Sequence, residues 1–232
     1  MITVVCWKWK QPGYRSHFQP YHVHVLRNMI KRNLHVPHRF VCITDDATGI
    51  NPALVETMEL WDEPAIVLPQ GKPNCYRRLR VFANDVHEWL GDRILSIDLD
   101  TVIIDDITPL VNINDDFKIW GDTARNTFYN GGFWLLKAGA RPQVWEKFTP
   151  KVPKITKSQG MVGSDQAWLS YCLGPRESKW TTDDGVYSFR NHMGSGTEPL
   201  PNDARIVFFH GKFDPWDSKV QEQSPWIKKY YR

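Results

Sequence analysis

The sequence predicts an α/β fold with a mainly parallel, mixed central sheet. Short β-rich segments alternate with segments of helical periodicity along most of the 232 residues. One segment, RILSI at 93–97, shows no strict alternation of polar and apolar residues, as expected for a strand buried on both faces. We expect a single domain over residues 1–232, because this length suffices for one hydrophobic core.

The first half of the chain supplies most of the predicted strands. These strands are Ile2–Cys6, Arg39–Thr44, Val55–Trp61, Ala65–Leu68 and Arg93–Ile97. Apolar residues recur at helical spacing between Phe18 and Asn33, and again over Tyr76–Leu90, so a helix is expected in each segment. Strands that alternate with helices in this way favour parallel pairing.

The second half continues the pattern with longer connections. Its predicted strands are Phe117–Trp120, Gly132–Leu136 and Arg205–Phe209. Pro142–Phe148 is expected to be a short helix, and Ser164–Leu173 another with Ser164 as its N-cap. Residues 151–163 and 175–203 are predicted to be long loops, and 217–232 a basic and aromatic tail exposed to solvent.

Composition limits the classes of protein and its location. A net charge of +3 is too small to favour nucleic acid binding. The four cysteines form no Cys-x-x-Cys pair, which is typical of a reducing compartment. The sequence contains neither a signal peptide pattern nor an apolar run of roughly 18–20 residues. We therefore expect a cytoplasmic protein, with at most peripheral contact at the inner face of the membrane.

The segment RILSIDLDTVIIDD places two acidic residues at the end of a predicted strand. Asp98 and Asp100 are two residues apart, so both side chains can face one site if the chain stays extended. Two neighbouring carboxylates repel unless a proton or cation lies between them, and Mg²⁺ or Mn²⁺ would satisfy them. The alternative without a ligand is a solvated turn, which is the interpretation given to Asp105-Asp106.

A phosphatase of the haloacid dehalogenase type is a second interpretation of this motif. In that class the strand ends Asp-x-Asp-x-Thr/Val and the first aspartate, here Asp98, is the nucleophile. Such an enzyme also needs a second acidic pair after a strand. Asp183-Asp184 is the later pair, and no apolar strand leads into it.

Several motifs in sequence order resemble those of the metal-dependent, retaining GT-A glycosyltransferases, in particular the glycogenin and bacterial galactosyltransferase-like group of family 8 type. The motifs are RILSIDLDTVIIDDITPL, YRRL at 76–79, YNGGFWLL at 129–136, GSDQ at 163–166 and HGKFDPW at 210–216. The resemblance implies a GT-A (Rossmann-like) fold and transfer of a sugar from a nucleotide-diphosphate sugar, with a UDP-sugar favoured and Mn²⁺ or Mg²⁺ as cofactor.

The resemblance also implies roles for individual residues. Asp165 and Gln166 would orient the sugar, with Gln166 near its reacting carbon, and Lys212 would neutralise the departing diphosphate. Further donor-binding residues are Arg78, Asp122, Asn130, Gly131, Gly132 and Gly211. Trp7, at the end of the first strand, and Asp45, after the second, are candidates for contact with the base or ribose, although Trp7 suits the core equally well.

The final motif departs from the pattern of the group. The usual His-x-x-Gly-x-x-Lys-Pro-Trp aligns Phe208 with the histidine and Asp214 with the lysine. His210 and Lys212 lie two residues away, a shift that preserves side-chain direction on an extended chain. We therefore predict His210 as the third metal ligand beside Asp98 and Asp100. The departure also leaves open a catalytically silent module that binds sugar nucleotides. The acceptor, whether glycan, lipid-linked or protein, is not predicted.

Overall fold

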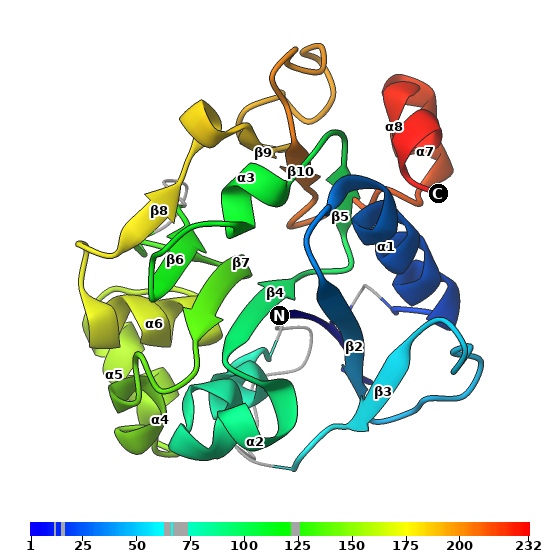
Figure 1. Cartoon of the computed structure of the whole chain (residues 1–232). Coiled ribbons are helices and arrows are strands. Elements are labelled where there is room, and N and C mark those ends of the chain that lie inside the picture. Colours follow the sequence, from blue (N-terminus) through cyan, green and yellow to red (C-terminus); the bar gives the residue numbers. More distant parts are fainter. Residues whose placement is uncertain (12, 15–16, 63–65, 67–73, 122–125) are drawn as a thin grey trace.

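A seven-stranded sheet runs through the molecule (Figure 1). In spatial order its strands are β3 (Glu56–Glu59), β2 (His38–Thr44), β1 (Ile2–Lys8), β4 (Arg93–Ile97), β7 (Asn130–Lys137), β6 (Phe117–Trp120) and β8 (Ser178–Trp180). β7 is antiparallel to its neighbours β4 and β6, and the other pairs are parallel. This computed structural model, which describes residues 1–11, 13–14, 17–62, 66, 74–121 and 126–232, confirms the predicted α/β fold.

A second sheet of three strands joins the first at the acidic motif. Its strands are β5 (Thr101–Ile103), β10 (Ile206–Phe208) and β9 (Val186–Ser188), with β10 in the middle. β10 is antiparallel to β5 and parallel to β9. Because Asp98, Leu99 and Asp100 connect β4 to β5, the acidic motif forms the corner between the two sheets.

Helices cover both faces of the large sheet. They are α1 (Pro20–Asn33), α2 (His87–Leu90), α3 (Thr108–Val111), α4 (Gln143–Glu146), α5 (Val152–Ser158), α6 (Asp165–Leu173), α7 (Ser218–Gln223) and α8 (Trp226–Tyr230). One core cluster joins α1 and α8 to the small sheet, and the other joins α2, α4 and α6 to the opposite face. Neighbouring residues of β4 divide between the clusters, with Leu95 in the first and Ile94 in the second. The strand is therefore buried on both faces, as predicted for RILSI.

The region expected to be one helix over Tyr76–Leu90 is instead three short pieces. A 3₁₀ helix, η1 (Tyr76–Phe82), is followed by a second, η2 (Asn84–Val86), and by α2. Ala83 between them is extended, with φ −71° and ψ 154°. Asn84 and Asp85 favour turns over helix interiors, and Arg80 forms a bidentate ion pair with Asp85 across the break. The prediction of a continuous helix was wrong because side chains closed a local turn.

Two predicted loops and the predicted tail contain regular structure. α5 occupies part of 151–163, and β8, the 3₁₀ helix η3 (Thr182–Asp184) and β9 occupy part of 175–203. Residues 217–232 form α7 and α8, and Ile227 and Tyr231 are buried there at 0% and 7% exposure. These elements are too short to show a clear period, and β8 and β9 depend on pairing with distant strands.

The remaining differences are small. The predicted strand Ala65–Leu68 lies, apart from residue 66, outside the described residues. Asp105 is exposed in a surface turn and Asp106 accepts a hydrogen bond from the Thr108 amide, in agreement with the interpretation of that pair. Within the described part of the chain, no helix combines the length and apolar character needed to cross a bilayer.

Candidate functional site

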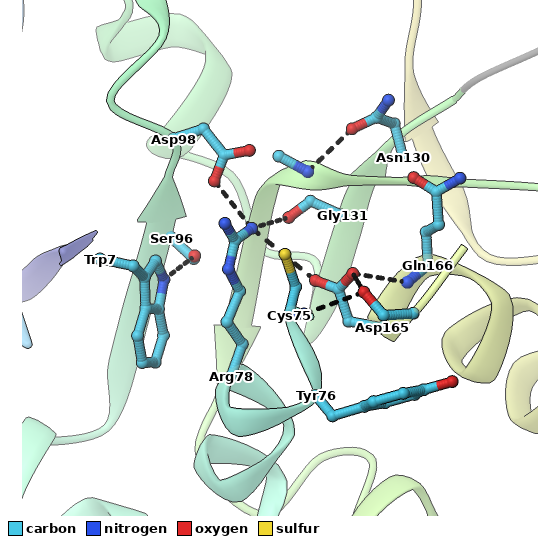
Figure 2. A network of polar contacts seen from close by, with 12 residues as sticks. Trp7, Cys75, Tyr76, Arg78, Ser96, Asp98, Asn130, Gly131, Asp165 and Gln166 are labelled. Carbon is cyan, nitrogen blue, oxygen red and sulfur yellow. Dashed lines mark hydrogen bonds and ion pairs between the residues drawn. The ribbon is translucent and has the colours of Figure 1, made fainter. Parts of the chain in front are cut away.

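Four segments distant in sequence meet at the carboxyl end of β4. Asp98 follows β4, Gly131 lies at the start of β7, Asp165 opens α6, and Arg78 comes from η1 (Figure 2). In open α/β sheets, ligands bind at this edge, beyond the carboxyl ends of the strands. The structure thus brings together the residues that the motifs singled out separately.

Arg78 is the centre of the network. Its Nη1 lies 2.7 Å from Asp98 Oδ1 and 3.7 Å from Asp165 Oδ2, and it donates a hydrogen bond of 3.2 Å to the carbonyl oxygen of Gly131. The side chain is buried, which by itself lowers the pKa of Arg78, but the nearby carboxylates more than compensate and raise it. The guanidinium therefore stays charged and links two acidic residues that come from different elements.

The acidic residues outnumber this single cation. Burial and the Asp165 charge raise the pKa of Asp98 to about 6, although Arg78 opposes the shift. Burial, followed by the charges of Asp98 and Asp214, raises the pKa of Asp100 well above its usual range. Burial also raises the pKa of Asp165. Such crowded carboxylates favour a bound cation or proton between them.

The oxygen atoms in this site suit a hard divalent cation. Asp98 Oδ1 and Asp165 Oδ2 are buried and accept no hydrogen bond of good geometry from the described residues, although both face Arg78. Asp98 and Asp100 thus offer carboxylate oxygens, the ligands that Mg²⁺ and Mn²⁺ prefer. Among the described residues, however, no three or more His, Cys, Asp and Glu side chains are arranged to hold a metal ion.

His210, the predicted third metal ligand, contacts Ser188 and Trp120. Its Nε2 is 2.7 Å from the hydroxyl of Ser188, and its ring packs edge-on against Trp120 at 5.8 Å. The aligned position, Phe208, is buried and stacks on Trp120 with ring centroids 4.6 Å apart. The structure therefore does not gather His210 with the two aspartates, and its role as a third ligand stays a prediction.

Gly131 and Gly132 provide room for the carboxylates. A Cβ atom on Gly131 would lie 2.6 Å from Asp165 Oδ2, and one on Gly132 would lie 3.0 Å from Asp98 Oδ2. Asn130 Oδ1 accepts a hydrogen bond of 2.9 Å from the Gly132 amide, and the Asp98 amide donates one of 3.0 Å to the Gly132 carbonyl. The two glycines are thus explained by close approach of acidic side chains, before any ligand is considered.

The first turn of α6 is fixed by its neighbours. The Gln166 amide donates 2.9 Å to Asp165 Oδ1, and the Gln166 side chain donates 3.3 Å to the Val162 carbonyl. Ser164 occupies the N-cap position, but its hydroxyl makes no capping bond and instead accepts from the Cys75 amide at 2.9 Å. This bond joins α6 to the start of η1, where Arg78 lies.

Cys75 and Trp9 belong to the site although the motifs did not indicate them. Cys75 lies beside the network (Figure 2), and burial raises the pKa of its thiol to about 12. The guanidinium of Arg78 lies 5.8 Å from the centre of the Trp9 ring. The signal for Trp9 was its position just beyond the first strand, where Trp7 was considered instead.

Trp7 and Asp45 make contacts within the protein. Trp7 is 2% exposed, and its indole Nε1 donates a hydrogen bond of 2.8 Å to the Ser96 hydroxyl (Figure 2). Asp45 Oδ2 accepts one of 3.0 Å from the Lys10 amide, two residues beyond the end of β1. Trp7 thus occupies the core, the alternative that was left open for it.

The remaining predicted donor-binding residues lie in the HGKFDPW segment, except Asp122. Lys212 is exposed, with its Nζ 5.3 Å from the centre of the Phe213 ring. Gly211 has φ +88°, a conformation that favours glycine. Asp214, at the aligned lysine position, is 9% exposed and close enough to Asp100 to raise its pKa. Asp122 lies outside the described residues.

Comparison with known proteins gives the same fold. The chain is similar to a galactosyltransferase, LgtC, solved in complex with donor and acceptor sugar analogues, with 12% identity, a TM-score of 0.63 and coverage of 99% of this chain and 96% of that one. It is also similar to the apo form of the glycosyltransferase GlyE of Streptococcus pneumoniae TIGR4, with 14% identity, a TM-score of 0.60 and coverage of 98% of this chain. The chain spans only 63% of the length of GlyE. No family model and no curated protein matches the sequence. The predicted GT-A fold is therefore confirmed, on structural similarity alone.

Proposed function

We propose that the protein is a glycosyltransferase that moves a sugar from a nucleotide-diphosphate sugar, with a UDP-sugar favoured, to an acceptor. The observation that carries the proposal is the network in which Arg78 joins Asp98, Asp165 and the Gly131 carbonyl at the carboxyl end of β4. The similar fold of an enzyme solved with donor and acceptor sugar analogues supports it. The donor would lie across this edge of the sheet.

Asp98 and Asp100 would hold Mn²⁺ or Mg²⁺, with His210 as the predicted third ligand. A divalent cation there would supply positive charge against the diphosphate as it departs. Lys212 and the Gly211 backbone are predicted to contact the same diphosphate. Because Lys212 is exposed, its side chain is free to turn toward a bound anion without breaking a buried contact.

Asp165 and Gln166 would orient the donor sugar together with Asn130 and Asp122. The Gln166 amide donates a hydrogen bond to Asp165 Oδ1, and Arg78 lies 3.7 Å from Oδ2. Because Oδ2 accepts no hydrogen bond from the described residues, it can accept one from a sugar hydroxyl. A second structure of LgtC carries a glutamine-to-glutamate change in its active site, which supports a role for a glutamine such as Gln166. Retention at the anomeric carbon is part of the proposal through the family resemblance.

The proposal also covers the residues that contact the base of the donor, the class of acceptor and the location of the enzyme. Trp7 and Asp45 were predicted to reach the base or ribose, and Trp9 is now a further candidate since its half-buried ring lies against Arg78. The acceptor would be a glycan, a lipid-linked sugar or a protein. We expect the enzyme to act in the cytoplasm, with at most peripheral contact at the membrane.

Donor consumption tests the proposal. A panel of UDP- and GDP-sugars is incubated with the wild type, with Asp100→Ala, and with Asp105→Ala as a matched control from the exposed turn beyond β5. We expect loss of one donor that requires Mn²⁺ or Mg²⁺ and is abolished only in Asp100→Ala. If no sugar nucleotide is consumed, the proposal fails.

The same assay separates the two alternatives. Donor binding without turnover would indicate the silent module. Hydrolysis of phosphomonoesters with a covalent adduct at Asp98 would indicate the phosphatase. The later acidic pair that the phosphatase would need is engaged elsewhere, since Asp184 in η3 pairs with Lys118 at 3.6 Å and accepts a hydrogen bond from the Thr181 amide.

A further inference from the structure

The carboxyl ends of β9 and β10 lie at the acidic corner of the candidate site (Figure 1). β9 is parallel to β10, and β10 is antiparallel to β5, so Ser188 and Phe208 at the ends of the first two strands lie beside Thr101 at the start of the third. The Phe209 amide donates a hydrogen bond of 2.8 Å to the carbonyl oxygen of Asp100. The residues that follow β9 and β10 therefore begin next to Asp100.

Hydrogen bonds hold the segment after β9 against the segment after β10. The Phe189 amide donates one of 3.0 Å to the last carbonyl group of β10, and the Asn191 amide donates one of 3.0 Å to the Ser188 hydroxyl. The same hydroxyl lies 2.7 Å from Nε2 of His210 on the neighbouring segment. The backbone on both sides of Arg190 is therefore anchored beside the HGKFDPW segment.

The side chain of Arg190 lies against the backbone of Gly211. A Cβ atom on Gly211 would be 3.2 Å from Arg190 Nη1 and 3.8 Å from its Cδ, and Gly211 has φ +88°. Any other residue at this position would be strained in its backbone and would press on the guanidinium. Arg190 is exposed, and no carboxylate among the described residues forms an ion pair with it. The guanidinium is thus placed beside this segment and is available to an anion.

Arg190 supplies positive charge that the HGKFDPW segment lacks. Within that segment the charges of Lys212 and Asp214 cancel, so the segment alone has no net attraction for an anion. A guanidinium is planar and can donate two parallel hydrogen bonds to phosphate oxygens, whereas an ammonium group acts as a point charge. At the edge of a sheet where ligands bind, such a group suits a phosphate better than a neutral ligand.

We propose that Arg190 binds the diphosphate of the nucleotide-sugar donor, with its guanidinium donating hydrogen bonds to phosphate oxygens beside Gly211. The inference deepens the proposed function and rests on it for the class of ligand. Arg190 reaches the diphosphate from the side of β9, separately from the residues that were predicted to contact it. A free nucleoside has no phosphate and therefore makes none of this contact.

Three variants test the contact. Arg190→Gln removes the charge, Arg190→Lys keeps the charge without the planar fork, and Arg176→Gln is the matched control. Arg176 is also exposed and outside every ion pair of the described residues, but it lies beyond the end of α6 that is remote from Asp165. Each protein is titrated by calorimetry with UDP, GDP and inorganic pyrophosphate in the presence of Mg²⁺, and with uridine by ligand-observed nuclear magnetic resonance. Thermal unfolding without ligand is measured in parallel.

We expect Arg190→Gln to bind pyrophosphate and the preferred nucleoside diphosphate about tenfold more weakly than the wild type, because a charged hydrogen-bonding group is lost. Arg190→Lys should lie between the two, since it keeps the charge alone. Uridine affinity and the melting temperature should not change, because uridine has no phosphate and Arg190 is exposed. Arg176→Gln should match the wild type in every measurement.

Equal affinity of the wild type and Arg190→Gln for every diphosphate would overturn the inference, and so would failure of the wild type to bind any of them. An equal loss of uridine affinity, or a lower melting temperature, would assign Arg190 to the structure of the site. The donor assay separates the inference from the proposed function. Diphosphate binding that depends on Arg190, without donor consumption, would support the inference and reject the glycosyltransferase, whereas donor consumption with an unchanged KM in Arg190→Gln would do the reverse.

Discussion

Replacing Gly131 by alanine places a methyl group against the Asp165 carboxylate. The added Cβ would lie 2.6 Å from Asp165 Oδ2 and 3.0 Å from its Cγ, whereas ordinary contact begins at 3.4 Å. The carboxylate must therefore move by about 0.8 Å, the difference between 3.4 and 2.6 Å. It has little freedom to do so, because Asp165 is 5% exposed and its Oδ1 is bonded to the Gln166 amide.

The size of the effect follows from this displacement. Overpacking of a buried site costs roughly 1–3 kcal/mol, and alanine recovers about 0.4–1 kcal/mol by restricting the unfolded chain. We expect a net loss of about 0–2.5 kcal/mol, or up to roughly 10 °C in melting temperature at about 2–4 °C per kcal/mol. A misplacement approaching 1 Å can cost about a hundredfold in rate, so kcat/KM should fall by roughly ten- to a hundredfold.

Stability and activity are measured together in a double-mutant cycle. Gly131→Ala, Asp165→Ala and the double variant are unfolded with urea, and donor consumption is assayed on each. The loss of stability in Gly131→Ala should largely disappear in the double variant, because the methyl group then meets no carboxylate. Gly121→Ala is the stability control, since its Cβ would meet no atom closer than Lys179 Cδ at 3.3 Å. Additive effects of Gly131→Ala and Asp165→Ala, or unchanged kcat/KM in Gly131→Ala, would refute the reasoning.

Three further predictions test other parts of the structure. Arg78→Gln leaves two buried carboxylates without their cation and should cost about 3–5 kcal/mol in urea unfolding, and a cost below about 1 kcal/mol would contradict the network. Burial lowers the pKa of His22 to about 4, so its contribution to stability is full above pH ~6.5, the unfolded value, and is lost as the pH falls toward 4. This contribution to the free energy of unfolding is about 1–2 kcal/mol after allowance for screening. Urea unfolding should show that loss in the wild type between about pH 6.5 and 4, and it should be absent in His22→Asn. Trp7→Phe leaves the Ser96 hydroxyl unpaired and should cost about 1–3 kcal/mol, whereas weaker donor binding at full stability would instead favour the predicted contact with the base.

Most of the strands were accessible from the sequence because they depend on local patterns. The apolar runs predicted β1, β2, β4, β6, β7 and β10 to within a few residues. Ligands bind beyond the carboxyl ends of the strands, so Asp98 and Asp100 after β4 were expected at that edge. The roles of Arg78, Gly131 and Asp165 followed only from the family resemblance. The structure places Arg78, Asp98, Gly131 and Asp165 in contact at that edge.

The broken helix over 76–90 and the order in 217–232 were not accessible in this way. The helix breaks at a local turn closed by Arg80 and Asp85. The start of η1 and the order in 217–232 depend on contacts between residues far apart in sequence. The Cys75 amide bonds to Ser164 across 89 positions, and Arg32 bonds to the backbone of Arg232 across 200. Local periodicity carries no information about such partners, so propensity alone favoured a regular helix and a solvated tail.

The sequence by itself determined the α/β fold and the acidic edge of its sheet, because hydrophobic periodicity and strand order fix which residues are buried and where strands end. Only the tertiary structure decided which side chains face that edge. It placed Trp7 in the core while Trp9 contacts Arg78, and it placed His210 against Ser188. Side-chain direction at a strand end depends on packing against distant elements, and the local pattern does not contain that packing.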